Sequence, residues 1–421
     1  MIDMGIREMA VELLVNNWVS LLTTFLVAFA VARVLVLSAR SFPILCGQSA
    51  NVSAVQSAHS KPTPRVGGVA IFAALVLTVF YVPETISLNY PYFLVAAGLL
   101  FFVGLAEDLG FGISPRWRLL AAVGASLAAV VMLGIWLPRL NIPYVDVAMG
   151  YWIVGVPVTL FITAGVANGF NLIDGVNGLS GYTGIVAALA LAAISVQAGN
   201  EALALVSIFL ACAVAGFFIV NYPRGTIFMG DAGAYTLGFV LAWFGIALLN
   251  AAPSVSAWSI LLTVYWPLCD TLLAMYRRSR SKRDAMAPDR LHAHQLVMRS
   301  LEILVLGRGR RNLANPLTTL VLAPFVAAPP LAGVLLWNNP LLAFGFAVVF
   351  LGLFWGTYFF AADMSRVYRR RRSDPRISAE LEGPTFAGPA KPVAVFKVAP
   401  EQSMVAPRRV SGEELTSGSR L

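Results

Sequence analysis

The segment from residue 168 to residue 179 carries the densest group of side chains that can do chemistry. It reads Asn-Gly-Phe-Asn-Leu-Ile-Asp-Gly-Val-Asn-Gly-Leu, and it interrupts a chain of apolar runs with three amides and one carboxylate, at Asn168, Asn171, Asp174 and Asn177. Amide and carboxylate oxygens can hold a cation or a polar ligand, and the interleaved glycines let backbone groups approach it closely. A polar turn between two helices is the plainer interpretation, and this segment alone favours it.

An acidic pair, Glu107-Asp108, ends another apolar run and is followed by Arg116 and Arg118. Neighbouring carboxylates repel each other, and negative charge at a helix C-terminus opposes the helix dipole. This unfavourable placement predicts a cation or a basic group nearby. The two arginines are candidates for that partner, or for ligands of a lipid phosphate. Neutralisation of the acids without any catalytic role is the alternative.

Asp231 begins a further apolar run, within the motif Phe228-Met-Gly-Asp-Ala-Gly and a few residues after Asn221. The helix dipole favours a carboxylate at the start of a helix. A simple N-cap is the common use of such an aspartate. The glycines before and after Asp231 favour close approach of a ligand instead.

The segment Lys61-Pro-Thr-Pro-Arg65-Val-Gly67-Gly68 is basic and leads into the next apolar run. Its two prolines stiffen the loop. Backbone N–H groups at the start of the following helix, together with Lys61 and Arg65, suit a phosphate. A basic loop that only obeys membrane topology explains the segment equally well.

Two of the three histidines, His292 and His294, lie in one short polar segment. Residues two apart do not share a helix face, so we expect a loop or an extended segment if they act together. Two histidines alone do not make a metal site. With oxygen ligands elsewhere, a hard cation fits better than zinc, and the imidazoles can then contact phosphate.

The composition is typical of a helical membrane protein. Of the 421 residues, 58% are hydrophobic and 12% are charged, whereas a soluble domain carries about a quarter charged residues. The net charge of +9 then marks cytoplasmic loops and anionic lipid or phosphate ligands, and we expect no nucleic-acid partner. The three cysteines are scattered and predict neither a disulfide framework nor a metal site.

About eleven apolar runs are long enough to cross a bilayer. The predicted fold is therefore an all-α polytopic membrane protein, and the length of the first run argues against a cleaved signal peptide. The runs lie near residues 12–37, 66–82, 91–109, 117–137, 151–170, 179–197, 201–221, 230–250, 256–277, 316–337 and 340–361.

Lysine and arginine predict the orientation of these runs. The loops that carry them alternate along the chain: 38–65, 110–116, 222–229, 278–315 and the tail after residue 362. On the other side only Arg7 and Arg139 appear. The positive-inside rule therefore predicts an external N-terminus and a cytoplasmic C-terminus, with all the polar motifs on the cytoplasmic face.

Two parts are predicted, a transmembrane domain over residues 1–362 and a cytoplasmic tail over residues 363–421. The tail begins with a polybasic stretch at 366–372 and continues with Pro, Ser and Glu but little apolar periodicity. This pattern predicts an anchor on anionic membrane lipids followed by disorder, with a plain stop-transfer signal as the alternative.

Carboxylates for Mg²⁺, cationic side chains for anions and glycines for backbone approach together describe a site for phosphate chemistry. In this order and at these separations the motifs resemble the polyprenyl-phosphate N-acetylhexosamine-1-phosphate transferases of glycosyl transferase family 4, over residues 10–362. The motifs are Lys61-Pro-Thr with Gly67-Gly68, Glu107-Asp108, Asn168-x-x-Asn171-x-x-Asp174-Gly, Phe228-Met-Gly-Asp231-x-Gly and His292-x-His294.

The resemblance implies a reaction in a bacterial inner membrane, with the active site on the cytoplasmic side. A polyprenyl phosphate such as undecaprenyl phosphate attacks the β-phosphorus of a UDP-sugar, and UMP leaves. Because the second pKa of a phosphate monoester is about 6, the attacking lipid phosphate is already largely a dianion. A strong base is therefore not required, although Asp108 is a candidate for one.

The resemblance also assigns residues to roles. It implies Mg²⁺, with Mn²⁺ as an alternative, held by Asp231 and Asp108. The implied catalytic residues are Glu107, Asp108, Asp231 and His292. The implied substrate contacts are Lys61, Arg116, Arg118, Asn168, Asn171, Asp174, Asn177, Asn221, Phe228 and His294.

The sequence departs from the family pattern at Glu107, where the first acid is usually aspartate, and at Asn177, where a second acid often stands. Gln295 replaces the third histidine of the family's triple. These changes make a base role for Glu107 and a metal role for Asn177 doubtful. They resemble the enzymes that initiate O-antigen or other surface glycans more than the peptidoglycan enzyme.

Two other classes compete with a transferase. Charges in membrane proteins often line transport pathways, so a transporter or flippase for a phosphorylated lipid or anion is the first alternative. Transporter sites lie near the membrane midplane, however, whereas these motifs are predicted at one boundary. A non-catalytic lipid-binding scaffold is the second alternative. The sugar, the prenyl length and the oligomeric state, including a homodimer, stay open.

Overall fold

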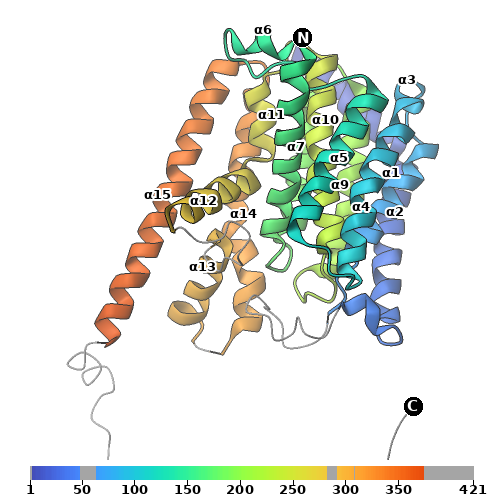
Figure 1. Ribbon diagram of the computed structural model, residues 1–421. Helices are drawn as coiled ribbons and strands as arrows, with labels where there is room; N and C mark the ends of the chain where they lie inside the picture. The colour runs from blue at the N-terminus through green and yellow to red at the C-terminus, as the bar shows by residue number, and fades with distance from the viewer. Residues whose placement is uncertain (1, 48–62, 282–291, 308, 374–421) are drawn as a thin grey trace, which may run out of the picture. The chain divides into compact units, whose positions relative to one another are not determined.

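The computed structural model describes residues 2–47, 63–281, 292–307 and 309–373. Every regular element in these ranges is a helix, which confirms the predicted all-α class (Figure 1). Nine of the described helices are long and apolar enough to cross a membrane. They are α1 (Ile2–Ser38), α4 (Asn89–Asp108), α5 (Pro115–Leu133), α7 (Trp152–Ile173), α8 (Leu179–Gln197), α9 (Glu201–Asn221), α10 (Gly230–Ala251), α14 (Arg311–Leu335) and α15 (Pro340–Ser373).

Shorter helices connect or extend these spans. They are α2 (Gly67–Leu77) with a 3₁₀ turn at Thr78–Phe80, α3 (Glu84–Ser87), α6 (Val145–Met149), α11 (Ala257–Thr263), α12 (Tyr265–Ser281) and α13 (Ala293–Ser300), with single turns at Pro43–Cys46 and Leu301–Val305. The run predicted at 66–82 is thus a short apolar helix with a 3₁₀ end. The total of eleven spans and the orientation in the membrane stay predictions.

The run predicted as one span at 256–277 is instead two helices. Helices α11 and α12 are bent by 83° relative to each other at Val264. Pro267, in the first turn of α12, has no N–H to donate, and its ring would clash with the carbonyl of Thr263 in a continuous helix. Figure 1 shows α12 lying across the direction of the neighbouring spans.

Helix α10 is the centre of the bundle. Almost all of its apolar window, 94%, is buried, and it packs against α4, α7, α2 and α8. A helix that is apolar all round belongs in a protein core. Small residues permit its closest contacts: a Cβ on Gly104 of α4 would lie 2.6 Å from the Cα of Ala232 in the first turn of α10.

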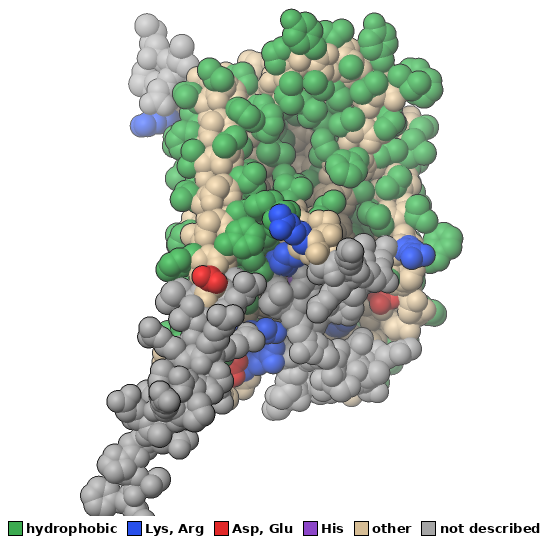
Figure 2. Space-filling view, turned by 60° about the vertical axis from the view of Figure 1, so that its left-hand side comes forward, with side chains coloured by type: hydrophobic (Ala, Val, Ile, Leu, Met, Phe, Trp, Pro, Cys, Tyr) green, Lys and Arg blue, Asp and Glu red, His purple; other side chains and the backbone are tan. Residues whose placement is uncertain are grey.

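The polar segments lie at one end of this bundle. The end of α4, the end of α7 and the beginning of α10 lie at the lower end in Figure 1, whereas α3 and α6 lie at the upper end. In Figure 2 hydrophobic side chains cover the upper part of the face in view, and most of the visible charged side chains lie below them.

The compact unit that contains the bundle runs from Met1 to Met364, and residues from Ser365 to Leu421 form a second unit. Of the second unit, the structure describes the residues up to Ser373, the end of α15. The prediction of a disordered tail falls mainly on residues 374–421, which lie outside the described part of the chain. The domain boundary predicted at residue 362 stays a prediction.

Candidate functional site

The candidate site is built around the N-terminus of α10. Asp231 lies in its first turn and is only 3% exposed. Its carboxylate forms an ion pair with the guanidinium of Arg118, from the first turn of α5. A second arginine, Arg65, brings its Nη2 to 3.7 Å from the other oxygen of Asp231. The structure therefore joins two motifs that lie more than a hundred residues apart.

Asp108, the last residue of α4, caps this helix from the side. Its two carboxylate oxygens accept the backbone N–H groups of Asp231 and Ala232, each at 2.8 Å. The first N–H groups of a helix have no partner within the helix and carry partial positive charge. The sequence predicted a cation or a basic group beside the acidic pair. The structure provides the positive N-terminal end of α10 as the partner of Asp108, in addition to basic side chains.

Gly230 permits this capping. Its φ is +74°, a conformation that L side chains rarely adopt. A Cβ at this position would also collide with the carbonyl oxygen of Arg65 and the carboxylate of Asp108. Because glycine lacks that atom, Asp108 and the loop before α2 can both reach the first turn of α10.

Asp174 approaches the same turn from the end of α7. Its carboxylate accepts hydrogen bonds from the Ser180 hydroxyl at 2.5 Å and from the Gly230 N–H at 3.2 Å. Burial raises the pKa of Asp174 to about 6, and the hydrogen bond from Ser180 opposes that rise. The segment 168–179 is therefore more than a plain turn, because its acid contacts the residue next to Asp231.

The amides at the end of α7 lie beside Tyr235, one turn along α10 from Asp231. The Tyr235 hydroxyl donates to Oδ1 of Asn168 at 3.3 Å, and it also interacts with the side chain of Asn171. Glu107 lies close enough to interact electrostatically with Tyr235, and its Oε2 is buried without a hydrogen-bond partner. Asn168, Asn171 and Glu107 thus lie around one tyrosine next to the Asp231 pair.

Asn177 and Asn221 join the loop after α7 to the loop between α9 and α10. Asn221 accepts the N–H of Gly178 at 2.7 Å and donates to the carbonyl of Ile227 at 2.6 Å. Asn177 donates through its side chain to the carbonyl of Pro223 at 2.9 Å and through its backbone N–H to Asn315 at 2.8 Å. These bonds give both amides a structural role, and their predicted contacts with substrate stay predictions.

The loop before α2 pairs with the segment before α10 through the backbone. The N–H of Phe228 donates to the carbonyl of Pro64 at 2.8 Å, and the N–H of Gly67 donates to the carbonyl of Phe228 at 2.9 Å. This pairing brings Arg65 to Asp231. The Phe228 side chain is half-buried. Lys61, the predicted phosphate contact of this motif, lies outside the described residues.

The histidine pair contacts the site through the loop after α7. The rings of His292 and His294 stack with centroids 5.7 Å apart. Nε2 of His294 lies 3.0 Å from where a Cβ of Gly175 would stand, next to Asp174. Burial lowers the pKa of His294 to about 4, so its ring is neutral at pH 7. His294 is therefore a buried neighbour of the Asp174 loop, and His292 is buried against the ring of His294.

Asp270 is a buried acid that lies outside the recognised sequence motifs. It lies on α12 at 0% exposure, and its Oδ2 is 2.9 Å from Nδ1 of His292. A carboxylate inside an apolar run is costly and is therefore a candidate functional residue. The sequence did contain a signal for this residue, because Asp270 is a carboxylate within the apolar run at 256–277. Arg116, by contrast, is exposed at the start of α5.

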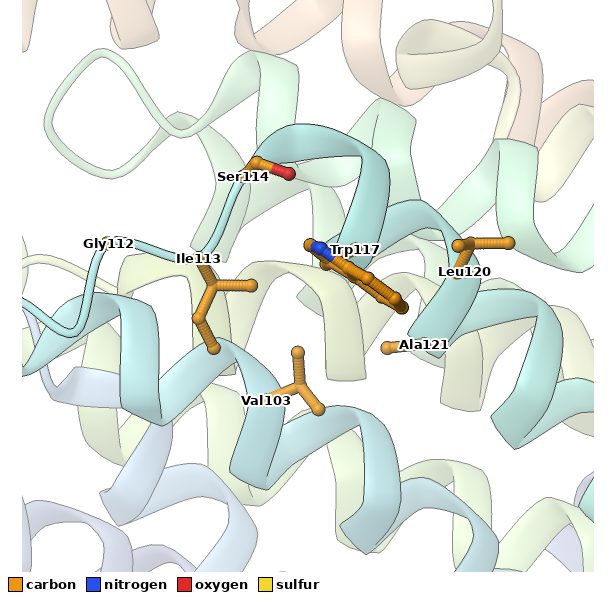
Figure 3. A pocket seen from close by; sticks show the side chains of 7 residues that line it. All are labelled: Val103, Gly112, Ile113, Ser114, Trp117, Leu120 and Ala121. Atoms are coloured by element: carbon orange, nitrogen blue, oxygen red, sulfur yellow. The ribbon is translucent and has the colours of Figure 1, made fainter.

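A groove opens between α4 and α5 beside the polar end of the bundle. It has a volume of about 730 Å³ and is lined by Val103 of α4, the loop 112–114, and Trp117, Leu120 and Ala121 of α5. Figure 3 shows Val103 of α4 and Ile113 close to the ring of Trp117 at the beginning of α5. Trp117 stands next to Arg118 in the sequence, so an apolar groove lies beside a cationic site.

The fold and the site describe a polytopic membrane protein with buried carboxylates and arginines gathered at one end of its helices. Residues 90–249 match the sequence profile of glycosyl transferase family 4. The undecaprenyl-phosphate alpha-N-acetylglucosaminyl 1-phosphate transferase of Yersinia pestis is 31% identical over 247 residues, which are 58% of this chain and 67% of the relative. The chain therefore belongs to glycosyl transferase family 4, which confirms the resemblance seen in its motifs.

Two further relatives agree. The decaprenyl-phosphate N-acetylglucosaminephosphotransferase of Mycobacterium tuberculosis is 30% identical over 276 residues, covering 57% of this chain and 66% of the relative. The probable undecaprenyl-phosphate N-acetylglucosaminyl 1-phosphate transferase of Bacillus subtilis is 27% identical over 243 residues, covering 57% and 67%. Each match spans about two thirds of the relative's length.

Proposed function

We propose that this protein transfers a sugar-1-phosphate from a UDP-sugar to polyprenyl phosphate, giving a polyprenyl-diphospho-sugar and UMP. The sugar is an N-acetylhexosamine or a deoxy derivative of one, in keeping with the N-acetylglucosamine in the relatives' names. One observation carries the proposal. Asp231, buried at the start of the central helix, is paired with two arginines at the polar end of an apolar bundle.

The reaction must bring two anions together, and this site carries the positive charge to do so. The side chain of Arg118 is 15% exposed and that of Arg65 is 39% exposed, so both can turn part of their guanidinium toward a ligand. Guanidinium groups suit phosphate because they present several donors in a fixed plane. A bound diphosphate would then share these arginines with Asp231.

The donor set also suits Mg²⁺, with Mn²⁺ as the alternative. No three His, Cys, Asp or Glu side chains within the described ranges are placed to hold one metal ion. Mg²⁺ is commonly held by one or two carboxylates together with substrate phosphates and water, so a sparse set of oxygen ligands fits it. Asp231 would hold the ion, and the buried Oε2 of Glu107, which has no hydrogen-bond partner, is a second oxygen.

A bound Mg²⁺ would supply neutralisation of phosphate charge. The residues of the chain do the rest: Arg65 and Arg118 bind phosphate oxygens, and the N–H bonds to Asp108 hold Asp231 in place. Both oxygens of Asp108 already accept backbone N–H groups, so its support of Asp231 carries more of this proposal than its predicted role as a metal ligand.

The groove between α4 and α5 suits the prenyl chain of the lipid substrate. It is apolar and lies next to Arg118, so a phosphate bound by that arginine can extend its chain along the groove. Arg116, exposed in the same helical turn, is available for the same phosphate or for a membrane lipid headgroup.

The protein is proposed to lie in a bacterial inner membrane with the site on the cytoplasmic side. Nucleotide sugars are made in the cytoplasm, and the distribution of lysine and arginine agrees with this orientation. A transporter or flippase is not favoured, because the carboxylates around Asp231, those of Asp108 and Asp174, lie at the ends of helices rather than near the membrane midplane. A homodimer and a role in O-antigen assembly stay predictions.

The test is metal-dependent release of UMP. Purified protein is incubated with undecaprenyl phosphate, Mg²⁺ and a panel of UDP-sugars, and UMP is measured. We expect release with a UDP-N-acetylhexosamine, loss of release with EDTA and recovery with Mg²⁺. We expect Asp231→Ala to lower the rate by about 10³-fold or more, because a ligand for transition-state charge is removed.

Size-exclusion profiles and thermal melts must show that Asp231→Ala is folded. Near-normal UMP release from folded Asp231→Ala would contradict the role of Asp231. Release of no UMP by the wild-type protein with any UDP-sugar, combined with movement of lipid phosphate across a vesicle membrane, would instead favour the flippase.

A further inference from the structure

Asp270 is a fully buried acid in an apolar part of the chain, and the proposed transfer as stated above assigns no role to it. It lies one turn after the break between α11 and α12. Its helix packs closely on α7: a Cβ on Gly169 would lie 3.0 Å from both the carbonyl oxygen of Pro267 and the hydroxyl of Thr271. Gly169 stands between Asn168 and Asn171, so this part of α12 packs beside the segment that carries the amides of the site.

Both oxygens of Asp270 point to the start of α13. Oδ2 lies 2.9 Å from Nδ1 of His292, and Oδ1 accepts the N–H of Ala293 at 3.2 Å. Nδ1 of His294 lies 4.0 Å from the same Oδ2. Buried carboxylates are stable only when they are paired and hydrogen-bonded, and these partners meet that need. The arrangement holds His292 through its ring, through its neighbour's backbone and through the stacked ring of His294.

This geometry determines which nitrogen of His292 is left for a substrate. A carboxylate can only accept, so Nδ1 must carry the proton that it shares with Asp270. Nε2 is then the ring nitrogen left for a substrate, and it can donate to a phosphate oxygen when the ring also carries its second proton as imidazolium. A carboxylate that orients a histidine in this way fixes both the tautomer and the angle of the ring.

We propose that Asp270 is the positioning residue for His292, holding the imidazole so that Nε2 faces the diphosphate of the nucleotide sugar. The inference rests on the proposed transferase function and extends it to a residue outside the recognised motifs. It also explains the break in the run at 256–277: the bend at Val264 turns α12 across the bundle and sets Asp270 beside the segment that carries His292.

A purely structural role is the competing explanation, because Asp270 also accepts the N–H of Ala293 at the start of α13. The two roles differ in what happens when His292 is absent. If Asp270 acts through His292, its substitution has nothing left to disturb in a His292→Ala background. If Asp270 only supports α13, its substitution lowers the rate equally in both backgrounds.

The experiment is a double-mutant cycle with Asp270→Asn and His292→Ala, measured as kcat and KM for UMP release. We expect Asp270→Asn to lower kcat by about 100-fold with a much smaller change in KM, which is the usual range for a disturbed acid–base or hydrogen-bonding histidine. The double variant should match His292→Ala alone. Asp270→Glu keeps the charge and should retain more activity than Asp270→Asn.

Thr271→Ser is the matched control, because it changes the neighbouring buried side chain on α12 but keeps a hydroxyl that can donate to Pro267. We expect it to have wild-type kcat. Multiplicative losses in the double variant, or wild-type kcat in folded Asp270→Asn, would overturn the inference.

A second measurement does not need activity. The chain has three histidines, so ¹⁵N-imidazole spectra of selectively labelled protein are simple, and His292→Ala identifies the signals of His292. We expect a protonated Nδ1 in the wild-type protein and a changed Nδ1 signal in Asp270→Asn. An unchanged signal would refute the pairing. A wild-type protein that releases no UMP would count against the transferase alone, and the spectra would still decide the contact.

Discussion

The two ends of α10 are capped in opposite ways. At its N-terminus the carboxylate of Asp108 accepts the N–H groups of Asp231 and Ala232. Past its C-terminus the guanidinium of Arg139 donates to the carbonyls of Leu249, Ala252, Pro253 and Val255, at 2.7–3.0 Å. Each cap places a charge of the sign that the helix dipole favours.

The two ends of α10 differ in the charged groups that are present in addition to the cap. Around Arg139 the carbonyls account for most of its donors, although its Nε has no partner. Around Asp108 the site also contains Asp231, Asp174, Arg65 and Arg118, which are more charged groups than a cap requires. Charge beyond the structural need is expensive to bury and is typical of functional sites, and the proposed transfer is assigned to this end. In this proposal the C-terminal end of α10 is capped only for stability, and its N-terminal end belongs to the site of transfer.

The largest contrast should come from two carboxylates that each accept two backbone N–H groups. Asp108 does so at the site, and Asp146 does so at the other end, accepting from Leu140 at 2.7 Å and Ile142 at 3.3 Å. We expect Asp108→Asn to lower UMP release by about 100-fold or more, because Asp231 loses its support. Asp146→Asn should leave kcat unchanged. Comparable losses of kcat in the two variants, measured in the same assay, would contradict the proposed difference in role between the two ends.

A pair of glycines gives a smaller contrast. Gly230 and Gly134 both have positive φ, +74° and +67°. Nothing lies within 4 Å of a Cβ at Gly134, whereas a Cβ at Gly230 collides with Arg65 and Asp108. We expect Gly134→Ala to cost about 1 kcal/mol of stability, the price of the left-handed conformation alone. Gly230→Ala should destabilise more and lose most of its activity. Thermal melts with parallel UMP assays measure both, and equal melting shifts would contradict the close contact.

The smallest effect on activity is expected at the opposite cap. Arg139→Met removes the donors to four carbonyls near the end of α10, and we expect a loss of about 1–3 kcal/mol in stability because groups are left unpaired. Below its melting temperature the variant should keep wild-type kcat and KM. A lowered thermal midpoint with intact kinetics supports the division of roles. A raised KM would instead mean that this end takes part in substrate binding.

Much of the architecture could be predicted from the sequence. Apolar length predicted the spans, because a bilayer demands a minimum number of consecutive apolar residues. The same rule gave no sign of the 83° bend within residues 256–277, since length and hydropathy do not register the effect of Pro267 on backbone direction. The acidic pair was recognised as unfavourable where it stands, and the structure supplies its partner in the N-terminus of α10.

Motif order identified the family and the candidate residues, because short polar motifs are conspicuous in an apolar chain. The packing of the helices decides which of these residues contact one another. Asp231 joins Arg118 because α10 and α5 converge at one end of the bundle. Asn177 and Asn221 turn toward the loops, and Asp270, a single acid without a motif, reaches His292 only because α12 bends. Side-chain partners far apart in the chain depend on helix directions and close approaches, and local residue patterns do not encode these.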